Sequence, residues 1–360
     1  MHNKKSILIF PANAASATTY SRIAAELGFN VVEASSEVNA DLIGGNNNIR
    51  HLPYVSEASF NQAFEDLLEQ EGIEKVYSPH PAVWNHLSAL SRNSSFSVQF
   101  EVCNPPPLLI EWDSFKQAYD FGRKCVEHNN SIVADGKVLS SHHYANLYRG
   151  YHNIPGQCDD AKLMLLTRIA RQIPKGDIVE IGSLYGRSAF ALAWLSEHHD
   201  LGPVICVDPW KTENISNQGK DAQLLNSMAD VYNWDRIFQA FVVSLAGSRN
   251  VNYLREPSAS ASDQYLTAAT TAGRITSNEL GITEVLGRIS MLHVDGNHRY
   301  EEVKRDVELW LPMVVEGGWL LLDDYVWAFG DGPKRVGDEL LGTGRIKQSI
   351  LFGDTLCLQL

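Results

Sequence analysis

Acidic residues at the ends of two apolar runs carry the strongest chemical signal in this sequence. Asp295 follows the run 289–294, and Asp323 and Asp324 follow the run 319–322. Because parallel strands end at the same edge of a sheet, these three carboxylates are expected to meet there. Clustered carboxylates repel one another unless a cation lies among them, and oxygen ligands suit Mg²⁺. The sequence therefore predicts a magnesium site, unless Asp295 caps the following helix and the paired acids are solvated turn residues.

A second group of residues lies where an earlier strand turns into a helix. The segment 180–188 begins with Glu180 and contains Gly182 and Gly186. Glycines in such a turn let the backbone approach a ligand, and a carboxylate at the end of a strand can bind an amino group. Asp208 ends the next apolar run, a position from which an acid reaches ribose hydroxyls in doubly wound sheets. The alternative is a tight turn without a ligand, with Asp208 capping a helix.

The elements that must position these residues follow a regular order after residue 160. Apolar runs separated by helical patterns indicate βα units and a parallel sheet. The last two runs flank Gly353-Asp354 and are typical of a β-hairpin. We expect strands over 178–181, 204–207, 251–254, 289–294 and 319–322, helices over 161–172, 188–197, 222–245 and 300–311, and a hairpin of 346–351 with 355–360.

The first part of the chain shows a similar alternation. The prolines at 105–107 end it, because proline cannot continue a helix or a central strand. The loop after its first strand has no glycine, which makes nucleotide binding there doubtful. We expect strands over 6–10, 30–33 and 75–78 and helices over 18–27, 60–70, 83–90 and 114–127.

The segment from Gly176 to Leu360 resembles the class I S-adenosylmethionine-dependent methyltransferases, on the Glu180–Ser188 turn and on Asp208. The resemblance implies an α/β fold with a Rossmann-like methyltransferase sheet and a terminal β-hairpin, preceded by a smaller Rossmann-like α/β domain. It implies that the turn holds the methionine part of the cofactor, that Asp208 binds ribose, and that Ile154-Pro155-Gly156 borders the pocket. The implied cofactor-binding residues are Glu180, Gly182, Ser183, Tyr185, Gly186, Ser188, Asp208 and Ser258, the last near adenine.

The acid pattern resembles metal-dependent O-methyltransferases that act on macrolide sugars and, more distantly, the cephalosporin-hydroxylase group. In that resemblance Asp295, Asp323 and Asp324 bind the metal, and His298, three residues after Asp295, is the general base. Asp295 and His298 are the implied catalytic residues, with S-adenosylmethionine and Mg²⁺ as cofactors. Aromatic residues near the sheet edge, which are often only packing residues, are candidates to line the acceptor pocket: Tyr151, His152, Tyr185 and Trp327.

Residues 1–126 resemble the domain that precedes the nucleotide-binding part of ATP-grasp ligases, on strand 6–10, on 51–55 and on Ser78-Pro79-His80. The nucleotide-binding domains themselves do not follow, so this resemblance implies an accessory domain for substrate capture or oligomerisation. We expect this domain over 1–126, a connector or lid over 127–159, and the methyltransferase domain over 160–360.

The expected function is S-adenosylmethionine-dependent, Mg²⁺-assisted O-methylation of a hydroxyl on a sugar or secondary metabolite. Three alternatives stay open: a hydroxylase on the same fold, a non-catalytic cofactor-binding sensor or scaffold, and, least favoured, an ATP-dependent ligase, for which no P-loop string is present.

The amino-acid composition excludes some classes of binding partner. Thirty basic and forty-three acidic residues give a formal charge of −13, which disfavours nucleic acid. No apolar run approaches the roughly 18 residues that span a bilayer, and residues 1–5 begin no secretory leader, so we expect a cytoplasmic protein with no membrane partner. The five cysteines suggest neither disulfides nor a zinc site. A small-molecule acceptor and a homo-oligomer are compatible with this composition.

Overall fold

The computed structural model of the chain describes residues 5–37, 49–94 and 96–360. The prediction about a leader in residues 1–5 therefore lies, except for Lys5, outside the described residues. The chain divides into two compact units at residues 117 and 118, inside helix α4 (Pro107–Asn130). The predicted boundary at 126 lies nine residues further along the same helix.

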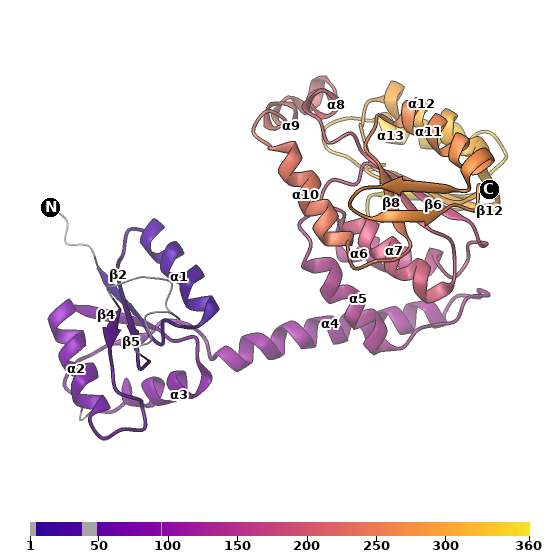
Figure 1. Cartoon of the computed structure of the whole chain (residues 1–360). Helices are drawn as coiled ribbons and strands as arrows, with labels where there is room; N and C mark the ends of the chain where they lie inside the picture. The colour runs from indigo at the N-terminus through magenta and orange to yellow at the C-terminus, as the bar shows by residue number, and fades with distance from the viewer. Residues whose placement is uncertain (1–4, 38–48, 95) are drawn as a thin grey trace. The chain divides into compact units, whose positions relative to one another are not determined.

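The first unit is built around a parallel sheet of five strands in the order β3-β2-β1-β4-β5 (Figure 1). Its apolar core includes Leu8, Val76 and a cluster of phenylalanine rings around Phe64. The predicted strands and helices are confirmed, while the two-residue strands β3 and β5 are too short to leave a periodic signal. The bounds are β1 (Ser6–Ile9), α1 (Ala15–Glu26), β2 (Asn30–Ser35), β3 (Arg50–His51), α2 (Phe60–Glu71), β4 (Ile73–Tyr77), α3 (Pro81–Leu90) and β5 (Glu101–Val102).

The second unit contains a sheet of seven strands in the order β13-β14-β12-β11-β6-β7-β8. Neighbours from β8 to β12 pair in parallel, whereas β14 runs antiparallel to both β12 and β13. This arrangement confirms the predicted Rossmann-like sheet with a terminal hairpin. The strands are β6 (Asp177–Ile181), β7 (Val204–Val207), β8 (Val251–Leu254), β11 (Ile289–Val294), β12 (Val314–Leu322), β13 (Gln348–Phe352) and β14 (Thr355–Gln359).

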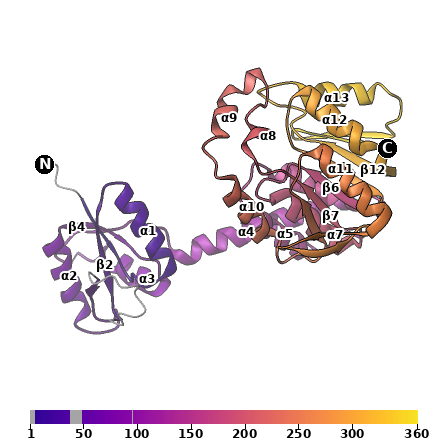
Figure 2. The same cartoon turned by 45° about the horizontal axis from the view of Figure 1, so that its top comes forward.

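Helices cover both faces of this sheet, as Figures 1 and 2 show. One core lies under α4, α5, α6, α7 and α10, and the other lies under α11, α12 and α13. Helix α12 presents buried Val303, Val307 and Trp310 to the sheet, as its periodicity predicts. The helices are α5 (Ser141–His152), α6 (Asp160–Ile169), α7 (Arg187–His199), α8 (Thr212–Ile215), α9 (Gln223–Met228), α10 (Trp234–Leu245), α11 (Ser258–Thr267), α12 (Tyr300–Trp310) and α13 (Gly332–Leu341), with short helical turns at Lys220–Ala222, Ala268–Ala272 and Leu311–Met313.

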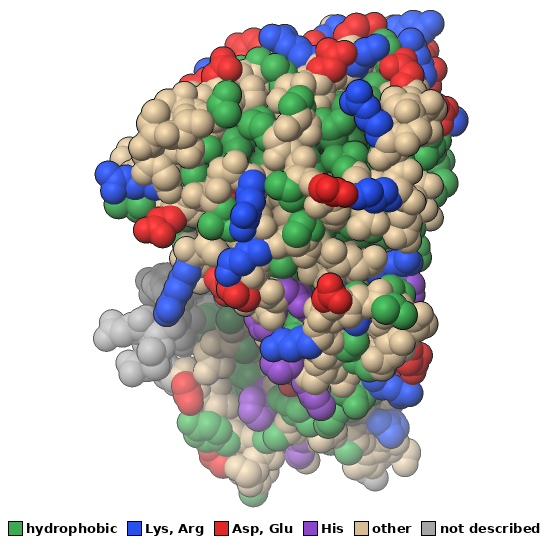
Figure 3. Space-filling view, turned by 90° about the vertical axis from the view of Figure 1, so that its right-hand side faces the viewer, with side chains coloured by type: hydrophobic (Ala, Val, Ile, Leu, Met, Phe, Trp, Pro, Cys, Tyr) green, Lys and Arg blue, Asp and Glu red, His purple; other side chains and the backbone are tan. Residues whose placement is uncertain are grey.

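Several elements of this unit differ from the prediction: α5, α8, α13 and the β9–β10 hairpin were not expected, and the helix predicted over 222–245 is two helices, α9 and α10. Helix α5 starts within the polar stretch 128–149 and is capped by Ser140, whose hydroxyl accepts a hydrogen bond from the backbone N–H of His143. It packs on α7, with the rings of His143 and His198 5.8 Å apart, and histidines gather on one face of the molecule (Figure 3). Strands β9 (Arg274–Ser277) and β10 (Gly281–Glu284) form a hairpin in the second polar stretch.

Among the described residues, no helix is both long enough and apolar enough to cross a membrane.

Candidate active site

The turn after β6 is held against the loop after β11. Gly182 has φ +88°, and a Cβ there would overlap the carbonyl oxygen of Asp295. Its N–H donates to Val207 O at 2.8 Å. Gly186, with φ +84°, precedes helix α7, so both predicted glycines adopt backbone conformations that other residues rarely adopt. The turn is therefore shaped by backbone contacts, with little space for side chains.

Asp208 fastens this turn to the end of β7. Its Oδ2 accepts hydrogen bonds from the backbone N–H groups of Ser183 at 3.1 Å and Leu184 at 3.0 Å. Its Oδ1 accepts from Trp210 N at 2.7 Å. Burial raises the pKa of Asp208, and these three donors oppose that rise. Leu184 and Trp210 both have positive φ angles, 46° each, so backbone strain gathers where the two strands end.

Glu180 lies beneath the turn and is fully buried. Its Oε2 accepts a hydrogen bond from Ser183 Oγ at 2.7 Å, and its Oε1 lies 3.1 Å from Nδ1 of His293. His293 is also fully buried, and its Nε2 has no hydrogen-bond partner among the described residues. That nitrogen lies 3.9 Å from Asp295 Oδ2. His293, which sequence reasoning did not single out, thus connects the two predicted groups of residues.

A buried lysine lies among the predicted metal ligands. Lys162 of α6 places its ammonium 2.8 Å from Asp295 Oδ2 and pairs even more closely with Asp323 Oδ2. The other carboxylate oxygen of Asp323 accepts a hydrogen bond from the hydroxyl of Thr355 on β14. Both oxygens of Asp323 are therefore engaged by the protein itself.

The charges in this cluster stabilise one another. Burial lowers the pKa of Lys162, but the carboxylates of Asp295 and Asp323 outweigh that effect and hold it well above its ordinary value. Burial likewise raises the pKa of Asp323, but Lys162 and neighbouring donors hold it below its ordinary value. Burial and the nearby Asp323 raise the pKa of Asp295.

Asp324 points to a different neighbour. It has φ +53°, and its Oδ2 lies 2.7 Å from Nε2 of His298, at ion-pair distance but without hydrogen-bond alignment. The Nδ1 of His298 lies 2.8 Å from Gln218 Oε1, which also accepts from the His298 backbone at 2.9 Å. Because an amide oxygen only accepts, Nδ1 carries a proton and donates it to this bond. The Trp327 ring stacks on the imidazole, with centroids 4.3 Å apart.

The predicted three-aspartate magnesium site does not fit this arrangement. Combinations of His293, Asp295 and Asp323, and of Asp295, His298 and Asp324, place ligand atoms within 4.8 Å of one another. Asp323, however, pairs with Lys162, whereas Asp324 pairs with His298. The Lys162 ammonium also contacts Asp295. A divalent ion on those two oxygens would lie directly beside a cation, which is electrostatically unfavourable.

Two further predicted positions lie near the start of α7. Ser188 is buried in the first turn of this helix, whereas Tyr185 is half-buried against the core. The predicted segment 154–156 lies here too, because Arg187 Nε donates to Ile154 O at 2.7 Å. Arg187, absent from the sequence-based list of candidates, therefore positions this segment beside the turn.

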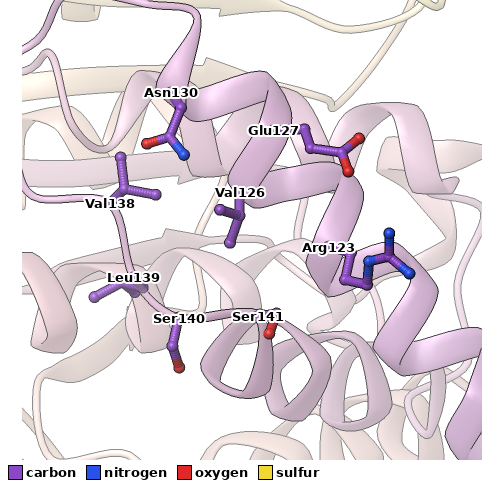
Figure 4. A pocket seen from close by; sticks show the side chains of 8 residues that line it. All are labelled: Arg123, Val126, Glu127, Asn130, Val138, Leu139, Ser140 and Ser141. Atoms are coloured by element: carbon purple, nitrogen blue, oxygen red, sulfur yellow. The ribbon is translucent and has the colours of Figure 1, made fainter.

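The remaining predicted positions have other neighbours. The Ser258 hydroxyl accepts from Trp310 Nε1 of α12 at 2.9 Å. Tyr151 is fully buried with its hydroxyl donating to Asp159 O, as in a core residue. His152 pairs with Asp160 on the surface. The pocket in Figure 4, about 500 Å³, is lined by none of the predicted site residues; it is formed by Arg123, Val126, Glu127, Asn130, Val138, Leu139, Ser140 and Ser141.

Solved structures with a similar fold include several methyltransferases. The O-methyltransferase NovP shares 16% identity, with 68% of this chain and 98% of NovP covered and a TM-score of 0.43. The calicheamicin methyltransferase CalS11 shares 14% identity over 72% of this chain and 94% of its own, with a TM-score of 0.42. TomG from Streptomyces achromogenes shares 14% identity over 65% and 94%, with a TM-score of 0.36. Likeness at this level identifies no substrate.

No curated protein matches this sequence. A family model described as a methyltransferase domain matches residues 179–325, from within β6 to the loop after β12. The matched segment contains the glycine turn, Asp208, Asp295, His298 and the paired acids. Together with the strand order of the sheet, this match makes the carboxyl-terminal unit similar to a methyltransferase domain.

Proposed function

We propose that this enzyme methylates a hydroxyl group of a small polar molecule, a sugar or secondary metabolite, with His298 as the general base. S-adenosylmethionine supplies an electrophilic methyl group on a sulfonium. The acceptor oxygen forms the new C–O bond while the C–S bond breaks, which leaves a methyl ether and S-adenosylhomocysteine. The hydroxyl proton passes to His298 Nε2. Positioning and proton removal are the main tasks left to the protein.

The observation that carries this proposal is the anchoring of the His298 ring. The 2.8 Å bond to Gln218 Oε1 keeps the proton on Nδ1, so Nε2 is the nitrogen able to accept another. The Trp327 ring stacks on the imidazole and limits its rotation. Asp324, 2.7 Å from Nε2, is suited to stabilise the imidazolium that forms. This arrangement supports a base of fixed orientation at the edge where the strands end.

The glycine turn supports cofactor binding at the same edge. We propose that Glu180 and Ser183 bind the amino-acid part of S-adenosylmethionine and that Gly182 and Gly186 allow the close backbone approach. Asp208 already accepts three backbone hydrogen bonds, so we propose that its remaining acceptor capacity serves a ribose hydroxyl. The other proposed cofactor contacts are Tyr185, Ser188 and Ser258.

The accessory role of the amino-terminal unit stays a proposal. Its parallel sheet supports an independent domain that captures substrate or joins copies of the chain. The formal charge of −13 supports a small-molecule acceptor and argues against nucleic acid.

Calorimetric titration of S-adenosylmethionine into the full chain tests the cofactor assignment. We expect saturable binding with and without EDTA, and weaker binding of methylthioadenosine, which lacks the amino-acid part. A screen of hydroxyl compounds, with S-adenosylhomocysteine release as readout, then tests the acceptor class. Absence of any S-adenosylmethionine binding would contradict the proposal, as would methylation confined to amine or thiol acceptors.

A further inference from the structure

Lys162 is buried in an unusual setting for a lysine. Its side chain is 3% exposed, and the nearest charged groups are the carboxylates of Asp295 and Asp323. The other buried lysine or arginine side chain among those described, Arg171, donates instead to the backbone oxygens of Asn129 and Gly136. A buried ammonium is stable only when it is paired and hydrogen-bonded. The position of Lys162 therefore depends on these two acids.

The helix that carries Lys162 is fixed at this place. Asp159 caps α6 by accepting a hydrogen bond from the Lys162 backbone at 2.8 Å. The next turns bury Leu163, Leu166 and Ile169 in the core under the sheet. Because Lys162 lies in the first turn, its side chain extends past this anchored helix to the ends of β11 and β12. The ammonium is therefore built into the fold.

The Lys162 ammonium contacts the same carboxylate oxygens that the expected metal ion would bind. A magnesium ion bound to Asp295 Oδ2 and Asp323 Oδ2 at about 2.1 Å would occupy the space next to both oxygens. The ammonium occupies that space, and Thr355 holds the other oxygen of Asp323. One positive charge bonded to both oxygens offsets the repulsion between these two carboxylates, which was the reason for expecting a metal.

We propose that the Lys162 ammonium is the resident cation of the Asp295–Asp323 pair, so that neither carboxylate is a ligand of a divalent ion. This inference rests on the proposed function of the same site, where Lys162 is a positioning residue. It holds Asp295 at the start of the loop that carries His298, whose Nε2 faces Asp324. The proton leaves the acceptor through His298, without a metal at Asp323.

The test is a calorimetric titration of Mn²⁺ into four forms of the EDTA-treated full chain. These are the wild type, Lys162→Met, Lys162→Arg, and Lys175→Met as a control, since Lys175 pairs with exposed Asp200 on the surface. We expect no saturable Mn²⁺ binding to the wild type, Lys162→Arg or Lys175→Met. Lys162→Met leaves the carboxylates without a counterion and should gain Mn²⁺ binding at least ~10-fold tighter than the wild type.

Two results would overturn the inference. One is stoichiometric, micromolar Mn²⁺ binding to the wild type that Asp323→Asn abolishes, because the ion would then displace Lys162. The other is folded Lys162→Met protein that gains no Mn²⁺ affinity. If Lys162→Met fails to fold, Lys162→Gln takes its place, with the same two outcomes, and the wild-type titration decides independently. S-adenosylmethionine binding, measured on the same samples, separates a failure of this inference from a failure of the proposed function.

Discussion

Nδ1 of His293 lies 3.1 Å from Oε1 of Glu180, and neither side chain is accessible to solvent. Because a carboxylate only accepts, the imidazole donates here, and its other nitrogen faces Asp295 at 3.9 Å. The two residues lie opposite each other on neighbouring strands β6 and β11. The cofactor turn and the acid cluster are therefore joined through the interior of the sheet.

Glu180→Gln should weaken S-adenosylmethionine binding at least ~10-fold, because hydrogen bonds to charged groups contribute roughly 1.5–3 kcal/mol. Calorimetry would measure the change, with methylthioadenosine expected to bind both forms equally. Asp177→Asn is the matched control, since Asp177 is buried at the other end of the same strand. Unchanged S-adenosylmethionine affinity in Glu180→Gln would mean that Glu180 does not bind the cofactor and only contacts Ser183 and His293.

His298→Ala should reduce turnover by ~10²–10⁴-fold and leave S-adenosylmethionine affinity unchanged, as for loss of a general base. Gln218→Leu should give a smaller loss, since it removes the acceptor that fixes the tautomer. His142→Ala, at an exposed position of α5, is the control. Single-turnover rates with an acceptor from the screen would measure these effects. Wild-type rates in His298→Ala would assign proton removal to another group.

Gly182→Ala should destabilise the carboxyl-terminal unit more than Gly317→Ala. Both glycines have positive φ, +88° and +78°, so each substitution carries a backbone cost of about 1–2 kcal/mol. Only Gly182 also lies against the Asp295 carbonyl, whereas a Cβ at Gly317 meets nothing within 4 Å. Chemical denaturation of the two variants would show the difference. Equal losses of unfolding free energy would mean that the turn at Gly182 can move away from the Asp295 loop without cost.

The stability of this unit should depend on pH through Asp306. Burial raises the pKa of this carboxyl to about 6, partly opposed by a hydrogen bond from Ser258. The folded state therefore binds the proton more tightly than the unfolded state, and stability falls as the pH rises from about 4 to about 6. Asp306→Asn should remove this loss, which reaches roughly 3 kcal/mol above that range.

Urea denaturation of the Asp306→Asn variant at several pH values measures this effect. Glu308→Gln, which removes an exposed carboxylate from the same helix, is the control. If the unfolding free energies of the wild type and of Asp306→Asn change with pH in the same way from pH 4 to pH 8, Asp306 does not titrate in that range.

Much of the fold follows from local patterns. The strands β6, β7 and β11 and the second half of β12 are buried and mostly apolar, as expected for strands covered on both faces, and the predicted strand ends brought Asp295, Asp323 and Asp324 to one edge. The hairpin of β9 and β10 was missed because its residues are mostly polar. Its position depends on Asn252 of β8, whose amide donates to Gly281 O at 3.0 Å.

The site was harder to predict because its decisive contacts are distant in sequence. Lys162 lies among leucines at an ordinary position of an amphipathic helix, and its partners are more than 130 residues away. Gln218 lies in a polar loop, 80 residues before His298. Neither residue type nor spacing reveals such pairs. Periodicity identified the strand ends, but only the structure shows which charged side chains pair with one another there.

Strand β14 has a consequence for how the protein is made. It lies inside the sheet between β12 and β13, and its first residue, Thr355, holds the carboxylate of Asp323. Of all the strands described, it leaves the ribosome last. While the chain is being translated, the inner edge of β12 is unpaired and the acid cluster is incomplete. The Asp323 contact forms only when β14 inserts, and until then β12 exposes an unpaired edge that favours aggregation.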